Sequence, residues 1–116
     1  ALFGAQVALM GELLEFAGHA GADPARLLEI LAETPVCSPA AALSARAMLA
    51  GQWAPAFPIA LVAKDFGLLA RSADGAGAAL PLSAETGRIF AHALAEGFGE
   101  DNITGIIQRY QDRPAA

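Results

Sequence analysis

One lysine stands alone among the basic residues of this 116-residue chain. Lys64 lies in an apolar stretch that runs from Phe57 to Ala70, and every other basic residue of the chain is an arginine. The next residue, Asp65, is the only acidic residue of that stretch. A buried charge without a partner is costly, so a buried Lys64 must be paired or face a cavity. The alternative is a lysine whose stem lies on apolar surface while its ammonium group reaches water.

Charge and cysteine content exclude several classes of protein. The net charge is −5 and there is no basic run, so we expect neither nucleic acid nor a membrane surface as a partner. Cys37 is the only cysteine, which rules out an internal disulfide, and no cysteine–histidine cluster has zinc-site spacing. The first helical stretch carries Gln6, Glu12 and Glu15, which is atypical of a membrane span or a signal peptide. These features predict a cytoplasmic protein without a metal site.

The elements that must position Lys64 and Asp65 are predicted to be helices. Alanine is the most frequent residue and β-branched residues are few, a balance that favours an all-α fold. The length fits one domain. Asp23-Pro24 and Ser38-Pro39 are typical helix starts, and Asp101 is the predicted cap of the last helix. Cap and turn signals predict about six helices, at residues 2–20, 24–33, 39–50, 59–73, 81–96 and 102–111, with an extended connector from Trp53 to Pro58.

The first helix has more apolar residues than one neighbour can cover. We therefore expect burial on more than one side and self-association of the chain. Three glycines recur every seven residues and could admit a partner backbone closely, although chance accounts for the spacing equally well. The predicted stripe comprises Leu9, Leu13, Phe16 and Ala20, widened by Met10, Leu14 and Ala17, and the glycines are Gly4, Gly11 and Gly18.

Four motifs occur in an order and spacing that resemble a known family. They are the segment Met-Leu-Ala-Gly-Gln-Trp-Ala-Pro-Ala-Phe at 48–57, Lys-Asp-Phe-Gly-Leu-Leu-Ala at 64–70, Leu-Pro-Leu at 80–82 and Gly-Phe-Gly-Glu-Asp at 97–101. Together with residues 9–24, they resemble the C-terminal domain of the β-hydroxyacid dehydrogenases, which include 3-hydroxyisobutyrate dehydrogenase. The chain departs from the family at Gln52 and Trp53. It also has Asn102-Ile103-Thr104-Gly105 where the family has an Asp-aromatic-Ser-Ala motif. These differences concern the substrate pocket more than the fold.

The resemblance implies that residues 1–116 are the helical C-terminal dimerisation and substrate domain of an NAD(P)-dependent oxidoreductase. Its substrate would be a small β-hydroxyacid or semialdehyde such as 3-hydroxyisobutyrate. The N-terminal NAD(P)-binding Rossmann domain is absent from the chain, and the family's catalytic lysine lies upstream of Ala1. No catalytic residue is therefore expected here, and the isolated chain is expected to be inactive.

The same resemblance assigns roles to three residues. Lys64 is the family's second lysine, which approaches the nicotinamide end of NAD or NADP, and Asp65 belongs to the same cofactor-binding site. Phe57 forms an apolar wall of the cleft. The family also implies a homodimer or tetramer, and the composition is typical of a bacterial protein. The alternative is a free-standing helical dimerisation or ligand-binding module without catalysis.

Overall fold

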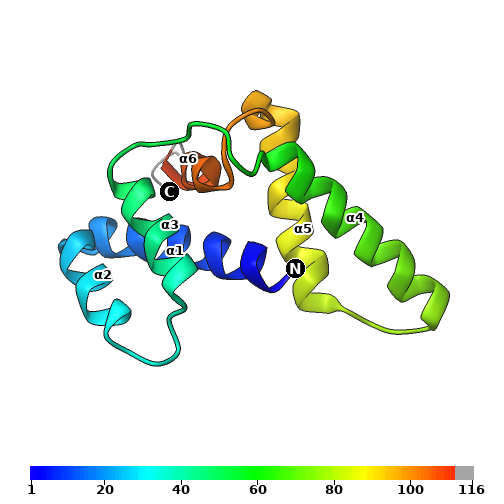
Figure 1. Cartoon of the computed structure of the whole chain (residues 1–116), viewed down its shortest axis with the longest axis horizontal. Coiled ribbons are helices and arrows are strands. Elements are labelled where there is room, and N and C mark those ends of the chain that lie inside the picture. Colours follow the sequence, from blue (N-terminus) through cyan, green and yellow to red (C-terminus); the bar gives the residue numbers. More distant parts are fainter. Residues whose placement is uncertain (112–116) are drawn as a thin grey trace.

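The computed structural model describes residues 1–111, and within this range the chain is helical and contains no strand (Figure 1). This confirms the all-α fold expected from the composition. The α-helices are α1 (Leu2–His19), α2 (Pro24–Ala32), α3 (Pro39–Leu49), α4 (Ile59–Ala76), α5 (Pro81–Ala93) and α6 (Gln108–Gln111). A π-helical turn, η1 (Leu94–Phe98), follows α5, and a 3-10 helix, η2 (Ile103–Ile107), precedes α6.

Two predicted helix starts are confirmed by side-chain caps. The Asp23 carboxylate accepts a hydrogen bond from the Ala25 amide at 3.0 Å, and the Ser38 hydroxyl accepts one from the Ala41 amide at 3.0 Å. Such caps satisfy amides that a helix N-terminus leaves without an intrahelical partner. The Ser38 hydroxyl also donates to Oε1 of Gln6 at 2.7 Å, so the start of α3 is tied to α1.

Two predicted helix ends and the predicted form of the last helix were wrong. α4 continues past the predicted end at residue 73 to Ala76, because the left-handed residue that stops it is Gly77 (φ 68°). α5 ends as an α-helix at Ala93 and passes into η1, where Gly97 has φ 98°. The predicted last helix is divided into η2 and α6, and Asp101 does not cap it. The Asp101 carboxylate instead accepts a hydrogen bond from Nε2 of Gln108 at 2.8 Å.

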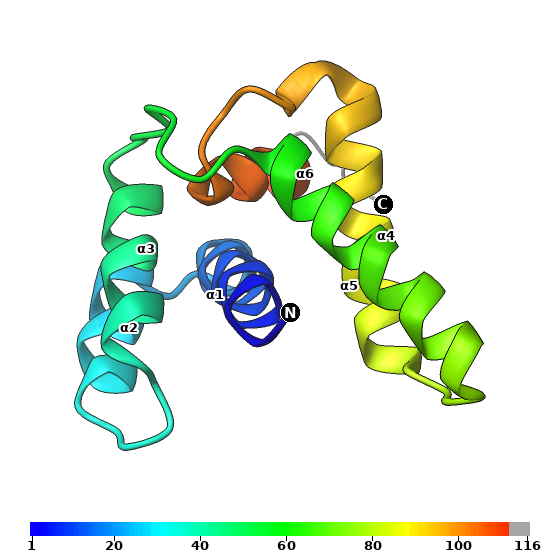
Figure 2. The same ribbon diagram turned by 45° about the vertical axis from the view of Figure 1, so that its right-hand side comes forward.

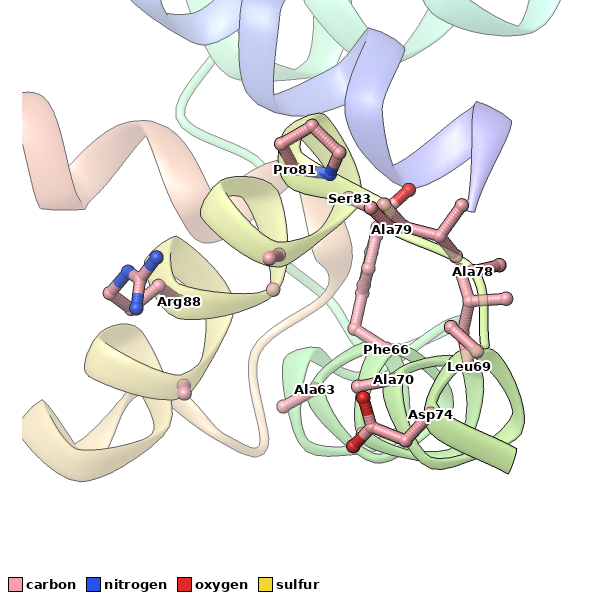
Figure 3. A pocket seen from close by; sticks show the side chains of 16 residues that line it. Ala63, Phe66, Leu69, Ala70, Asp74, Ala78, Ala79, Pro81, Ser83 and Arg88 are labelled. Carbon is pink, nitrogen blue, oxygen red and sulfur yellow. The ribbon is translucent and has the colours of Figure 1, made fainter. Parts of the chain in front are cut away.

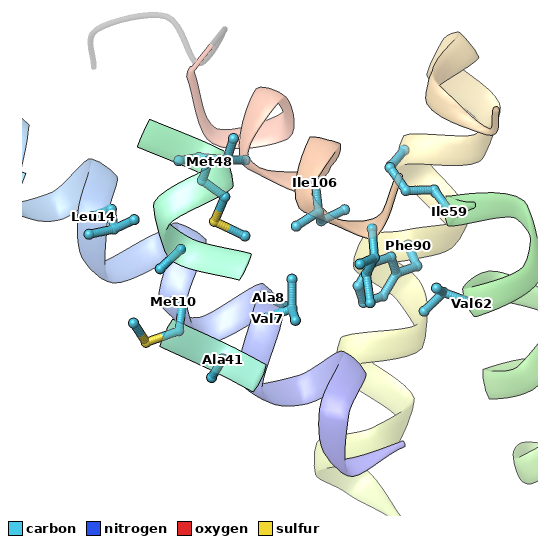
Figure 4. Close-up of a cluster of buried hydrophobic side chains, with 14 of the residues drawn as sticks. Val7, Ala8, Met10, Leu14, Ala41, Met48, Ile59, Val62, Phe90 and Ile106 are labelled. Atoms are coloured by element: carbon cyan, nitrogen blue, oxygen red, sulfur yellow. The ribbon is translucent and has the colours of Figure 1, made fainter. Parts of the chain in front are cut away.

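α1 lies at the centre of the molecule. Figure 2 shows it nearly end-on, with α2 and α3 on one side, α4 and α5 on the other, and α6 above. The buried side chains gather where these elements meet α1 (Figure 4). The core includes Val7, Leu14, Met48, Ile59, Phe90 and Ile106.

One face of α1 stays open within this chain, although helices pack against the rest of it. Val7, Met10 and Leu14 are buried, whereas Leu9 and Phe16 are 53% and 69% exposed. The predicted burial on more than one side is confirmed by the helices that pack around α1, but these helices leave one face of it open. The open face carries much of the stripe that the sequence had suggested as core.

The glycines of α1 do not form a face for a partner. A methyl group added at Gly4 would stand 2.7 Å from Cε2 of Phe66, and one added at Gly11 would stand 3.0 Å from Cε2 of Tyr110. At both positions, the absence of a side chain leaves room for an aromatic ring of the same chain. Gly18 differs, because an added methyl group would meet only Cγ of Pro24, at an ordinary contact distance of 3.7 Å.

Tyr110 fixes the last described turn to α1. Its hydroxyl donates a hydrogen bond to the Ala8 carbonyl oxygen at 3.2 Å, and its ring lies against Gly11. Burial, with a smaller contribution from the charge of Glu12, raises the pKa of Tyr110 well above its ordinary value of 10.0. The folded chain therefore favours the neutral phenol.

We predict that this contact makes the folded chain sensitive to alkali. The unfolded chain loses the tyrosine proton near pH 10.0, before the folded chain does. The contribution of Tyr110 to stability is thus complete below that pH and falls above it, by at most about 1.4 kcal/mol per pH unit. Urea unfolding from about pH 9 to 11.5 should show this decline, and Tyr110→Phe should reduce it. Because Tyr110 is the only tyrosine, tyrosinate absorbance reports on it alone, and ionisation at the unfolded pKa would contradict the prediction.

A second prediction compares two equal substitutions in α1. Gly4→Ala should lower the free energy of unfolding by about 1–3 kcal/mol, because the new methyl group overlaps the Phe66 ring. Gly18→Ala should leave stability unchanged or raise it by up to about 1 kcal/mol, through better helix propensity without a clash. Urea unfolding measures both, and equal stability of the two variants would show that Phe66 yields freely.

Candidate functional site

Lys64 and Asp65 are both exposed on α4, in its second turn. Within residues 1–111, no ion pair joins either residue to another side chain. Of the two environments expected for Lys64, the structure shows the exposed one. Its ammonium group is therefore available to a group outside the described chain.

The helical repeat explains why these two residues face outward. Ile59, Val62 and Phe66 are buried on one side of α4. Leu61 and Leu68 follow the opposite side, with Lys64 between them, and they are 48% and 46% exposed. We call Leu61, Lys64, Asp65 and Leu68 the outer face of α4. A single cation between apolar side chains suits a ligand that offers both an apolar surface and a hydrogen-bond acceptor.

Phe57 precedes α4, in the connector formed by residues 51–58. It is half-buried and packs against the edge of the core. Its amide donates to Oδ1 of Asn102 at 2.8 Å, and its carbonyl oxygen accepts from the Ile103 amide at 2.8 Å. The backbone of Phe57 is thus held on both sides, although the connector is not part of a helix.

The residues that hold the connector were not predicted from the sequence. Asn102 and Thr104 contact the connector, from which they are separated by 45 and 52 positions. The only signal at these positions was the departure from the family motif at 102–105. A contact over such a separation has no local pattern that periodicity could reveal.

A hollow of about 520 Å³ lies between α4 and α5 (Figure 3). Most of its lining is apolar, and its polar side chains include Asp74, Ser83 and Arg88. The lining of the hollow includes none of the predicted site residues Lys64, Asp65 and Phe57. The hollow opens on a different side of α4 from the outer face, so the predicted site residues and this hollow are separate features.

The described residues offer no metal-binding cluster of three or more His, Cys, Asp or Glu side chains. Within residues 1–111, every helix is too short or too polar for a membrane span. The chemistry available at the outer face of α4 is therefore that of an ammonium group and a neighbouring carboxylate beside apolar side chains. Such a face can bind and orient a polar ligand, and it contains no general base or nucleophile paired for catalysis.

Comparison with known proteins agrees with the helical architecture. Residues 1–110 match the family model described as NAD-binding of NADP-dependent 3-hydroxyisobutyrate dehydrogenase. The fold is similar to that of a 3-hydroxyisobutyrate dehydrogenase from Salmonella typhimurium, with a TM-score of 0.86 and 22% sequence identity. This alignment covers 92% of the chain and 38% of the Salmonella protein. A comparison with curated proteins gives no match.

The fold and the family match together define an all-α domain of the dehydrogenase type. Because the match covers residues 1–110, the chain belongs to the family of NAD-binding domains of 3-hydroxyisobutyrate dehydrogenase. The resemblance noted from the four sequence motifs is thereby confirmed.

Proposed function

We propose that this chain is the C-terminal domain of an NAD(P)-dependent oxidoreductase. Its substrate is a small β-hydroxyacid or semialdehyde such as 3-hydroxyisobutyrate. The observation that carries the proposal is the outer face of α4, where the only lysine of the chain is exposed between Leu61 and Leu68 within a chain of this family. Lys64 differs from an ordinary surface lysine in the two large apolar side chains, Leu61 and Leu68, that flank it on this face.

The residues of the chain fit one end of a nicotinamide cofactor. Lys64 is free to donate charge-assisted hydrogen bonds to acceptors of the cofactor or the substrate, and Asp65, exposed beside it, offers a carboxylate that can accept hydrogen bonds from the same ligand. No glycine-rich loop follows a strand in residues 1–111, so the pyrophosphate must be held elsewhere. When bound, NAD or NADP supplies or accepts the hydride. Phe57 serves as an apolar wall that keeps water from the reacting atoms.

The rest of the active site belongs, in this proposal, to a preceding segment of a longer protein. The chain corresponds to 38% of the Salmonella enzyme, which leaves room for a nucleotide-binding domain. The family's catalytic lysine would lie in that segment, shortly before Ala1. The isolated chain would therefore fold without catalysing hydride transfer. We place the whole protein in the cytoplasm.

We further propose that the chain forms a homodimer or tetramer through the open face of α1. Leu2, Leu9 and Phe16 recur every seven residues along this face and are 75%, 53% and 69% exposed. A row of large apolar side chains on the central helix is costly to leave in water and is typical of an interface. A second copy of the chain is the partner that the family resemblance favours.

The first test of the proposed function is the kinetics of Lys64→Ala in the full-length enzyme. Loss of one charge-assisted hydrogen bond, about 1.5–3 kcal/mol, should lower kcat/KM roughly ten- to a hundred-fold. Stability should change by less than about 0.5 kcal/mol, because the side chain is exposed and unpaired within residues 1–111. Lys64→Arg, which retains the charge, should lose less activity. Wild-type kinetics for Lys64→Ala would make Lys64 an ordinary surface residue.

The second test concerns assembly. Phe16→Glu places a charge on the open face of α1 and should shift sedimentation toward the monomer. Val36→Glu is the matched control, because Val36 is 84% exposed and lies in the connection between α2 and α3 rather than on α1. Circular dichroism should show the same helix content for both variants. A wild-type chain that sediments as a monomer at high micromolar concentration would refute the proposed interface.

A further inference from the structure

Asn102 joins two segments that are far apart in the sequence. Its side-chain oxygen accepts hydrogen bonds from the amides of Phe57, at 2.8 Å, and Ala56, at 3.2 Å. Its side-chain nitrogen donates to the Thr104 hydroxyl at 3.0 Å, and that hydroxyl donates to the Gln52 carbonyl oxygen at 2.8 Å. The Asn102 side chain therefore both accepts and donates hydrogen bonds where the connector meets residues 102–104.

The connector has no regular structure of its own. Two backbone bonds hold its carbonyl oxygens, from the Asn102 amide to Trp53 and from the Ile103 amide to Phe57, but two of its amides rely on the Asn102 side chain. Residues 51–58 include Pro55 and Pro58, which have no amide hydrogen to donate. The amides of Ala56 and Phe57 find their acceptor in Oδ1 of Asn102. Without that oxygen, the amide of the half-buried Phe57 has no other hydrogen-bond acceptor among residues 1–111.

The first turn of α4 is held in a different way. The Ile59 amide donates to the Asp101 carbonyl oxygen and the Ala60 amide to the Gly99 carbonyl oxygen, both at 2.9 Å. These are backbone bonds, which do not depend on the side chain at position 102. Loss of the Asn102 side chain should therefore loosen Phe57 while α4, with Lys64, stays in place.

We propose that Asn102 is a positioning residue that acts through Phe57. It fixes the backbone from which the Phe57 ring projects and so sets the apolar wall of the cleft, whereas the ammonium group of Lys64 is positioned independently by α4. This inference rests on the proposed function of Phe57 and Lys64. Asn102 would then influence the rate of the reaction without contacting the cofactor or the substrate.

The local part of the proposal is tested by amide hydrogen exchange in the 116-residue chain. Asn102→Ala should speed exchange at Ala56 and Phe57, on the order of tenfold for a lost hydrogen bond. Exchange at Ile59 and Ala60 should stay near wild type, because their acceptors are backbone oxygens. Asn102→Asp retains an acceptor for both amides and should preserve their protection. Equal acceleration at all four amides, or none, would overturn the inference.

The functional part is tested by double-mutant cycles in the full-length enzyme. Asn102→Ala should lower kcat/KM roughly ten- to a hundred-fold, the size expected when a group lining a site moves by about 1 Å. It should add no further loss to Phe57→Ala, and it should multiply the loss caused by Lys64→Ala. Additive effects with Phe57→Ala would show that Asn102 does not act through Phe57.

Three further outcomes complete the test, and the last two separate this inference from the proposed function. If Asn102→Ala does not fold, Asn102→Asp decides: near-wild-type kcat/KM and protected Ala56 and Phe57 amides support the inference, and loss of either overturns it. If neither Lys64→Ala nor Phe57→Ala changes the kinetics, the proposed function fails and the positioning role fails with it. If both variants are impaired and Asn102→Ala is not, the proposed function stands and the positioning role alone is refuted.

Discussion

The aromatic ring of Phe66 determines how the two sides of the molecule meet. It stacks on Phe90 of α5 with ring centroids 5.8 Å apart, and its edge lies over Gly4 of α1. A methyl group added at Gly87 of α5 would stand 3.0 Å from Cβ of Phe66. Two glycines and one aromatic partner thus let α1, α4 and α5 approach closely. Since dense packing resists even small changes in volume, this contact fixes the rotation of α4 about its axis.

The orientation of α4 in turn decides which of its residues reach a ligand. With Phe66 and Val62 turned inward, Lys64 must face outward, because the two sides of the helix are set by a repeat of 3.6 residues. The connector before α4 is held separately, by hydrogen bonds to the loop that precedes η2. The outer face of α4 and the backbone of Phe57 therefore have separate supports.

The family assignment and the geometry contribute different parts of the functional argument. Membership over residues 1–110 places the chain among the dehydrogenase domains. The geometry adds that Lys64 is exposed, that the open face of α1 is apolar, and that the hollow between α4 and α5 is separate from both. The proposed cofactor-binding role draws on both parts, because the family supplies the chemistry and the geometry shows which side chains are accessible.

The sequence by itself determined the helices, the starts of α2 and α3 and the family, because caps, prolines and helical periodicity act over a few residues. It also marked Lys64, whose isolation is visible in composition alone. Only the tertiary structure decided which side of α1 is buried, since that helix is apolar nearly all round and its neighbours make the choice. Only the tertiary structure joined Asn102 to Phe57 and Tyr110 to Ala8, because hydrogen bonds between segments tens of residues apart follow from the packing of helices and leave no local trace.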